Sequence, residues 1–102
     1  MDETQRQELI DRFRLAGFVE ACRLLEEGIS SMKDIDIAML AGAGYDKGPF
    51  AWADSVGLDT VKERLEALSA KRPEVFSVPK VLVDLVGRGL LGEKTKRGFY
   101  EY

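Results

Sequence analysis

The 102-residue sequence contains no histidine. Histidine is the commonest general base near neutral pH and a frequent metal ligand. Its absence excludes a histidine base, Ser–His and Cys–His nucleophile pairs, and histidine metal sites within this chain. Most common hydrolase mechanisms are therefore excluded.

Cysteine and long apolar runs are also scarce. The single cysteine, Cys22, cannot form an internal disulfide or a multi-cysteine metal cluster, and it fits a reducing compartment. No apolar run approaches the roughly 20 residues that a membrane span needs. The first residues, Met1 to Arg6, lack the pattern of a signal or transit peptide. We therefore predict a cytoplasmic protein with no membrane contact and no metal site.

Charge is unevenly distributed over the chain. Residues 1–70 carry 8 Lys+Arg against 14 Asp+Glu, and residues 71–102 carry 7 against 4. A basic end on an acidic body can attract phosphate groups, although a solvated basic tail is the more common explanation. Aromatic residues hardly interleave with these bases before Phe99, so nucleic-acid binding is not predicted.

Helical periodicity dominates the first half of the chain. Thr4 and Gln7 have the spacing of a capping box, which predicts the start of a long helix that ends near Gly28. Its buried stripe is predicted to contain Leu9, Ile10, Phe13, Gly17, Ala21, Leu24 and Leu25. A second helix is predicted to begin at Ser30 or Ser31 and to stop in the glycine-rich segment 42–44.

Three shorter helices are predicted to follow. Gly48-Pro49 opens one that closes at Gly57, and a second capping box at Thr60 and Glu63 opens the next, which Pro73 ends. The last begins at 77–79 and ends at 87–89, before a basic segment at 92–102. These patterns predict an all-α fold, a compact bundle of about five helices with a short basic C-terminal tail. At this length, residues 1–102 are expected to form one domain.

No motif in the chain completes a cofactor or catalytic site. Segment 42–44 resembles part of a dinucleotide fingerprint, but Lys47 occupies a required glycine position and a helix rather than a strand precedes it. Gly87 and Gly92 have phosphate-loop spacing, but Glu93 stands where lysine is needed. The acids Asp34 and Asp36 are interpreted as a solvated helix face, and Cys22 as a core residue.

Several blocks in series nevertheless resemble one family. The blocks are Glu20-Ala21-Cys22-Arg23-Leu24-Leu25-Glu26-Glu27-Gly28, Asp34-Ile35-Asp36, the run from Gly42 to Phe50, Ala53-Asp54, Gly57-Leu58-Asp59, and Leu91 to Tyr100. Their order and spacing over residues 18–102 are similar to the C-terminal helical domain of NAD-dependent 3-hydroxyacyl-CoA dehydrogenases.

The resemblance implies a role in a larger enzyme of fatty-acid β-oxidation. That parent enzyme would oxidise 3-hydroxyacyl-CoA to 3-ketoacyl-CoA. Its nucleotide-binding domain would hold NAD and the catalytic histidine–glutamate pair. The present domain would close over the acyl-CoA substrate and provide contacts for a homo-oligomer. Alone, the chain is expected to bind no cofactor and to be inactive.

The resemblance also identifies candidate site residues and departures. Asp11 falls at the family's asparagine, which reaches toward the reaction centre, and Gly17 replaces a bulky aromatic residue. The family's Pro-Met before Gly48 is Asp46-Lys47 here. The substrate-side candidates are Lys47, Lys94, Lys96 and Arg97, whose positive charges could attract the phosphates of CoA.

An alternative function stays open at this point. The charged residues at positions 11 and 47 favour a degenerate second helical copy of a multifunctional enzyme, which would act only as a structural or assembly module. The retained terminal motif, Leu91 to Tyr100, favours the substrate-side role instead. The hypothesis of a phosphate-binding or nucleic-acid-binding bundle is supported only by the basic end of the chain.

Overall fold

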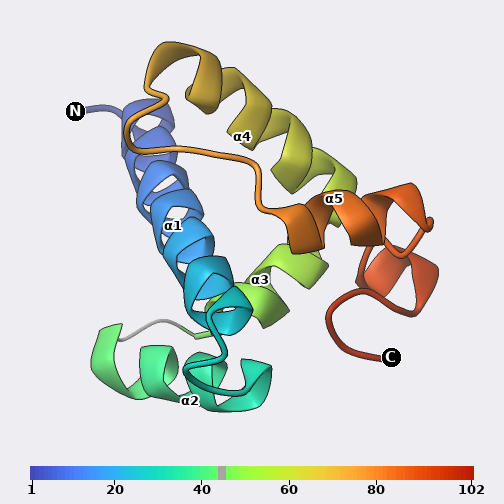
Figure 1. Cartoon of the computed structure of the whole chain (residues 1–102). Helices are drawn as coiled ribbons and strands as arrows, with labels where there is room; N and C mark the ends of the chain where they lie inside the picture. Colours follow the sequence, from blue (N-terminus) through green and yellow to red (C-terminus); the bar gives the residue numbers. More distant parts are fainter. Residues whose placement is uncertain (44–45) are drawn as a thin grey trace.

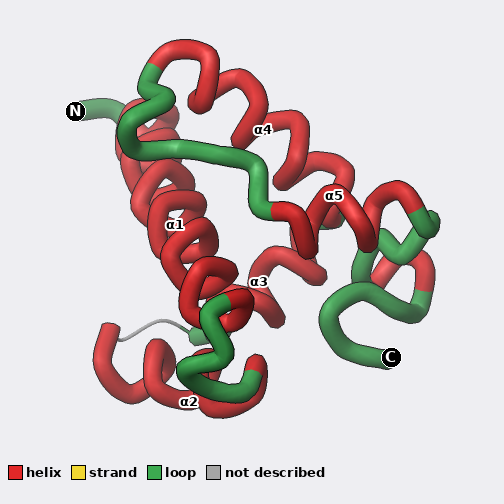
Figure 2. Tube along the Cα trace, viewed as in Figure 1, coloured by secondary structure: helices red, strands yellow, loops and turns green. Residues whose placement is uncertain are grey.

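The computed structural model describes residues 1–43 and 46–102 and is built from helices (Figure 1). In chain order they are α1 (Glu3–Glu26), α2 (Met32–Ala43), α3 (Pro49–Val56), α4 (Leu58–Lys71), α5 (Lys80–Gly87) and a 3₁₀ turn, η1 (Glu93–Thr95). Figure 2 shows only helices and connecting segments over the described residues. The predicted all-α bundle of five helices is confirmed. The second helix was expected to stop in segment 42–44; α2 includes residues 42–43, and residues 44–45 lie outside the described residues.

Two of the predicted helix starts are wrong. The capping box of α1 is formed by Asp2 and Gln5 rather than by Thr4 and Gln7: each side chain bonds the other residue's backbone N–H, at 2.8 and 3.0 Å. Helix α4 begins at Leu58 without a side-chain cap, two residues before Thr60. Leu58 is fully buried and its N–H donates to the carbonyl of Leu91 at 2.9 Å, so a tertiary contact fixes this start.

The buried stripe of α1 is shorter than predicted. Leu9, Ile10 and Phe13 are 46%, 39% and 65% exposed, whereas burial begins at Leu15. Helices α2 and α3 lie at the C-terminal end of α1, whereas α4 extends toward the N-terminal end of α1 (Figure 1). The first three turns of α1 thus carry apolar side chains that this chain covers only in part.

An aromatic cluster joins the first helix to the last residues of the chain. The ring centroids of Phe18 and Phe50 lie 6.2 Å apart, and Phe99 lies 5.8 Å from Phe18 and 4.8 Å from Phe50. Phe18 and Phe50 are fully buried. The predicted basic tail thus contributes to the core through Phe99, although its charged side chains stay on the surface.

Asp36 caps a helix to which it does not belong. The first amides of a helix have no partner within it, and Gly48, the N-cap of α3, has no side chain to supply one. Pro49 has no N–H, and Asp36 on α2 accepts the next two amides, from Phe50 at 2.8 Å and Ala51 at 3.1 Å. Asp36 is only 6% exposed, so the predicted solvated face is wrong at this residue.

Asp54 holds the C-terminal tail in the same manner. Its two oxygens accept the backbone N–H groups of Phe99 at 2.9 Å and Tyr100 at 3.0 Å, and the hydroxyl of Tyr102 at 2.7 Å. The hydroxyl of Tyr100 donates to Asp36 at 2.8 Å. The two buried carboxylates therefore connect α2, α3 and the tail in one hydrogen-bond network.

Glycine is required where the backbone approaches these carboxylates. A Cβ at Gly48 would lie 2.5 Å from the Cα, Cβ and Cγ atoms of Asp36. A Cβ at Gly98 would collide with a carboxylate oxygen of Asp54. Neither close approach leaves room for a side chain, so both glycines are fixed by the carboxylate network.

Replacing Asp54 with alanine should destabilise the fold strongly. Three partly buried donors would lose their acceptor, at a cost of about 3 kcal/mol in total. Asp84→Ala, which removes an exposed carboxylate from α5, is the matched control and should stay within about 0.5 kcal/mol of the parent chain. Urea denaturation of both variants is the measurement. Equal losses in the two variants would contradict the role assigned to Asp54.

The two tail tyrosines should make stability fall at alkaline pH. Burial raises the pKa of Tyr100 and Tyr102, and their hydrogen bonds to Asp36 and Asp54 raise it further. A phenol with a raised folded-state pKa stabilises the fold fully below the unfolded pKa of about 10, and this contribution is lost as pH rises through the folded-state pKa.

Denaturation midpoints measured across that pH range test this coupling. We expect the free energy of unfolding of the parent chain to fall above about pH 10. This fall should be smaller in the Tyr100→Phe/Tyr102→Phe variant, which has no tail phenols to titrate. Parallel curves for the two proteins would mean that the tyrosine hydroxyls are not coupled to folding.

Candidate functional site

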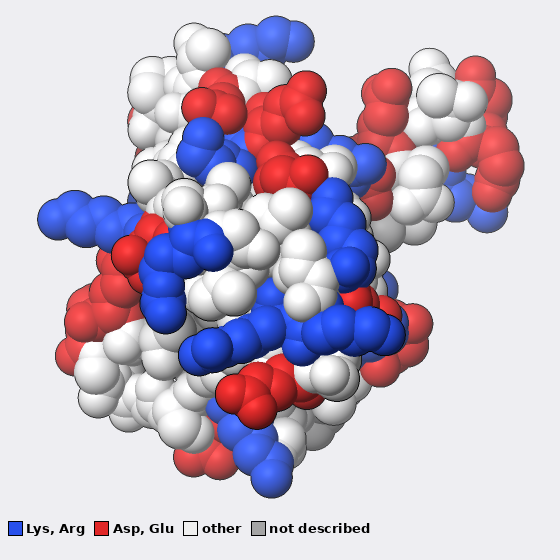
Figure 3. All heavy atoms as spheres, turned by 90° about the vertical axis from the view of Figure 1, so that its right-hand side faces the viewer, with Lys and Arg blue, Asp and Glu red and all other residues white. Residues whose placement is uncertain are grey.

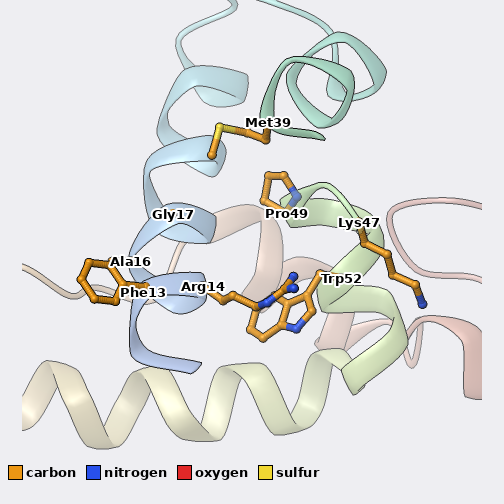
Figure 4. A pocket seen from close by; sticks show the side chains of 8 residues that line it. All are labelled: Phe13, Arg14, Ala16, Gly17, Met39, Lys47, Pro49 and Trp52. Atoms are coloured by element: carbon orange, nitrogen blue, oxygen red, sulfur yellow. The ribbon is translucent and has the colours of Figure 1, made fainter. Parts of the chain in front are cut away.

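A cavity of about 340 Å³ lies where α1, α2 and α3 meet (Figure 4). Its walls are mainly apolar, because six of its eight lining residues are uncharged. The lining residues are Phe13, Arg14, Ala16, Gly17, Met39, Lys47, Pro49 and Trp52. Such a surface favours an uncharged group over a charged one.

Arg14 closes one side of the cavity. Its guanidinium lies 5.7 Å from the ring centroid of Trp52, and one of its terminal nitrogens donates to a carboxylate oxygen of Asp46 at 3.1 Å. This hydrogen bond and the positive charge of Arg14 lower the pKa of Asp46. The pair ties the segment before α3 to α1, and Asp46 compensates the charge of Arg14.

Lys47 connects the cavity to the tail. It lines the cavity, but its side chain extends away from Met39 and Pro49 in Figure 4, and its Nζ lies 3.8 Å from a carboxylate oxygen of Glu93. Glu93 is the first residue of η1. The cavity and the basic tail are therefore neighbouring parts of one surface.

The cations of the tail are also opposed by carboxylates. Lys94 donates to Asp59 at 2.8 Å, which lowers the pKa of Asp59, and Arg97 lies 4.0 Å from Glu101. Lys96 is exposed and has a positive φ of 68°. Basic and acidic groups alternate over the face shown in Figure 3. The attraction of CoA phosphates to these cations stays a prediction. The neighbouring carboxylates weaken the positive electrostatic field of the cations.

Asp11 lies elsewhere on the molecule. Its carboxylate accepts a hydrogen bond from Gln7 at 3.0 Å and lies 3.7 Å from Arg64 of α4. Asp11 and Arg64 line a separate groove of about 650 Å³ between α1 and α4. The structure therefore brings Lys47 close to the tail candidates through Glu93, and it places Asp11 in a different cavity.

Sequence reasoning missed the residues that shape this surface. Asp36 and Asp54 were present in the matching blocks, but their roles as acceptors were not recognised. A usable signal was that each follows a buried apolar residue, Ile35 or Ala53, within a helix. Gly17 was predicted to be part of a buried stripe, and it is instead part of the cavity wall.

The chemical groups of this surface suit binding rather than covalent chemistry. Burial raises the pKa of the Cys22 thiol, so the thiol stays protonated and is a poor nucleophile. Among the described residues no three acidic or cysteine side chains converge as a metal site. None of the described helices combines the length and the apolar character needed to cross a membrane.

Comparison with known proteins identifies one family. Residues 9–102 match the family model described as "3-hydroxyacyl-CoA dehydrogenase, C-terminal domain". A probable 3-hydroxyacyl-CoA dehydrogenase of Caenorhabditis elegans is 47% identical over 96 residues, which are 92% of this chain and 32% of that protein. The mitochondrial hydroxyacyl-coenzyme A dehydrogenase of Mus musculus is 43% identical over 92% of this chain and 31% of its own length.

A solved structure extends the likeness to the fold. The (S)-3-hydroxybutyryl-CoA dehydrogenase of Ralstonia eutropha superposes with a TM-score of 0.83 at 34% identity, over 90% of this chain and 33% of that one. The chain thus spans about a third of the length of the relatives it matches.

Proposed function

The chain belongs to the 3-hydroxyacyl-CoA dehydrogenase family as its C-terminal helical domain, and we propose that it forms the substrate side of an enzyme that oxidises a 3-hydroxyacyl-CoA to the 3-ketoacyl-CoA with NAD. The observation that supports this most is that the residues shared with the family converge. The hydrogen-bond network described above joins the start of α3, beside the cavity, to the C-terminal tail. It is formed by Asp36 and Asp54 with the close approaches at Gly48 and Gly98.

The oxidation requires groups that this chain does not have. Hydride transfer needs a positioned nicotinamide and a base that accepts the hydroxyl proton. The sequence has no histidine, residues 42–43 belong to helix α2, and Lys47 stands where a dinucleotide loop needs glycine. The residues present do not fit NAD, so a nucleotide-binding domain is the proposed partner that holds the cofactor and the base.

A purely structural role is the second candidate. Each charge that departs from the family pattern has an opposing partner within the chain: Asp11 with Arg64, Asp46 with Arg14, and Lys47 with Glu93. Charges paired in this way need no ligand. A degenerate second helical copy, kept only for assembly, would have the same contacts.

The proposed compartment is the cytoplasm, as the lone reduced cysteine suggests. Some relatives, including the mouse protein, are named mitochondrial. Fractionation of the source cells distinguishes the two compartments.

A domain exchange separates the substrate-side role from the structural role. We expect the isolated chain to form no NADH from 3-hydroxybutyryl-CoA and NAD above the no-protein control. Fused to the nucleotide-binding domain of the Ralstonia eutropha relative, in place of that enzyme's own C-terminal domain, it should restore NADH formation. Turnover by the isolated chain would contradict the proposal, and a folded but inactive fusion would favour the structural module.

The exposed start of α1 is proposed as a contact for self-association. Leu9 and Ile10 leave apolar surface exposed near the start of α1. Sedimentation at micromolar concentration should therefore show a dimer or larger species. Leu9→Ser/Ile10→Ser should shift it to monomer, whereas Val83→Ser, at an equally exposed valine on α5, should not. Sedimentation of the parent chain only as a monomer would contradict this proposal.

A further inference from the structure

Arg12 has a different environment from the other arginines of the chain. Seven of the eight arginines have a carboxylate within 4.0 Å. Over the part of the chain that the structure describes, Arg12 has no such partner. Its guanidinium lies instead over the ring of Phe76, 5.6 Å from the ring centroid. Stacking of this kind orients the guanidinium and leaves its N–H groups free to donate to an acceptor in the same plane.

Arg12 lies at a groove between α1 and the segment that joins α4 to α5 (Figure 1). The groove has a volume of about 290 Å³, close to the lower limit of ~300 Å³ for small-molecule sites. Its other lining residues are all apolar: Leu9, Phe13, Ala16, Val75 and Phe76. Phe76 is buried, whereas Phe13 and Val75 are 65% and 40% exposed, so the groove is open to solvent.

One oriented cation beside an apolar groove defines the chemistry of a ligand. A guanidinium binds a carboxylate through two parallel charge-assisted hydrogen bonds, and apolar walls favour an aliphatic chain. A phosphate group carries nearly two negative charges and three acceptor oxygens, which is more than one guanidinium satisfies. The larger groove between α1 and α4 is less suitable for an anion, because Glu8 and Asp11 line it beside its cations.

We propose that the groove at Arg12 binds an aliphatic monocarboxylate, whose carboxylate pairs with Arg12 and whose chain lies on the apolar walls. The inference does not depend on the proposed function, because a free carboxylate is neither the thioester substrate nor its oxidation product. A second copy of the chain is a less suitable occupant, although Leu9 is also proposed for self-association. A symmetric contact through this groove would bring Arg12 of both copies together, and none of the lining residues is acidic.

Calorimetric titration of the 102-residue protein with octanoate tests the charge and the chain of the ligand separately. Octanamide has the same chain without the charge, and acetate has the charge without the chain. We expect octanoate to bind at least tenfold more tightly than octanamide, because the amide cannot form the charge-assisted pair with Arg12. Octanoate should also bind more tightly than acetate, because its methylene groups are buried in the groove.

Two matched substitutions on α1 test the role of Arg12. Arg12→Gln removes the positive charge but keeps an N–H donor, and it should weaken Kd for octanoate at least tenfold. Arg6→Gln makes the same change on the same helix at a residue that does not line the groove, so it should match the parent protein. Circular dichroism should show the same helix content in both variants.

A second pair of variants leaves Arg12 unchanged. Val75→Glu places a carboxylate in the groove, where it repels an anionic ligand and competes for Arg12, so octanoate binding should be lost. Val83→Glu introduces the same charge at an exposed valine of α5 outside the groove and should bind octanoate as the parent protein does.

Three results would overturn the inference. One is equal affinity for octanoate and octanamide, and another is unchanged affinity for octanoate in Arg12→Gln or Val75→Glu. The third is a parent protein that binds no octanoate but sediments as a dimer, with Arg12→Gln shifting it to monomer. That result would place a second copy, rather than a carboxylate ligand, at Arg12.

Discussion

Two buried carboxylates, Asp36 and Asp54, are the constraint on which the rest of the structure depends. Each lies in one helix and accepts backbone amides from a neighbouring segment: Asp36 from the start of α3, and Asp54 from the tail. Buried charge is unfavourable unless hydrogen bonds satisfy it, and here amides and tyrosine hydroxyls do so. The network explains why a short chain without disulfides keeps its C-terminal tail in place, and why the Phe99 ring reaches the core.

The sequence predicted the elements of this fold better than their ends. Five helices follow from apolar periodicity and from glycine and proline at the boundaries, because these signals are local. The start of α4 depends on the buried contact between Leu58 and Leu91, and the exposure of Phe13 depends on where the other helices lie; neither is encoded in neighbouring residues. Asp36 was misassigned for the same reason, since its partners Phe50 and Tyr100 are 14 and 64 residues away.

The candidate site was predictable only in part. The resemblance identified the blocks that surround it, and charge counting identified the basic tail. The carboxylates opposite Lys94 and Lys47 come from α4 and η1, so their compensating effect required the three-dimensional arrangement. The cavity at Gly17 could not be predicted from the local sequence because an empty volume between three helices has no local pattern. The described surface is therefore mainly an apolar cavity beside a nearly balanced set of charges.

Amide hydrogen exchange measures the central claim, that the carboxylates fix the tail as firmly as the helices. In the intact chain the N–H groups of Phe99 and Tyr100 are bonded to Asp54, although they belong to no helix. The account predicts that these two amides exchange as slowly as those of the buried residues of α3, such as Ala53. Exchange of Phe99 and Tyr100 at the rate of an unprotected turn, with α3 still protected, would contradict it.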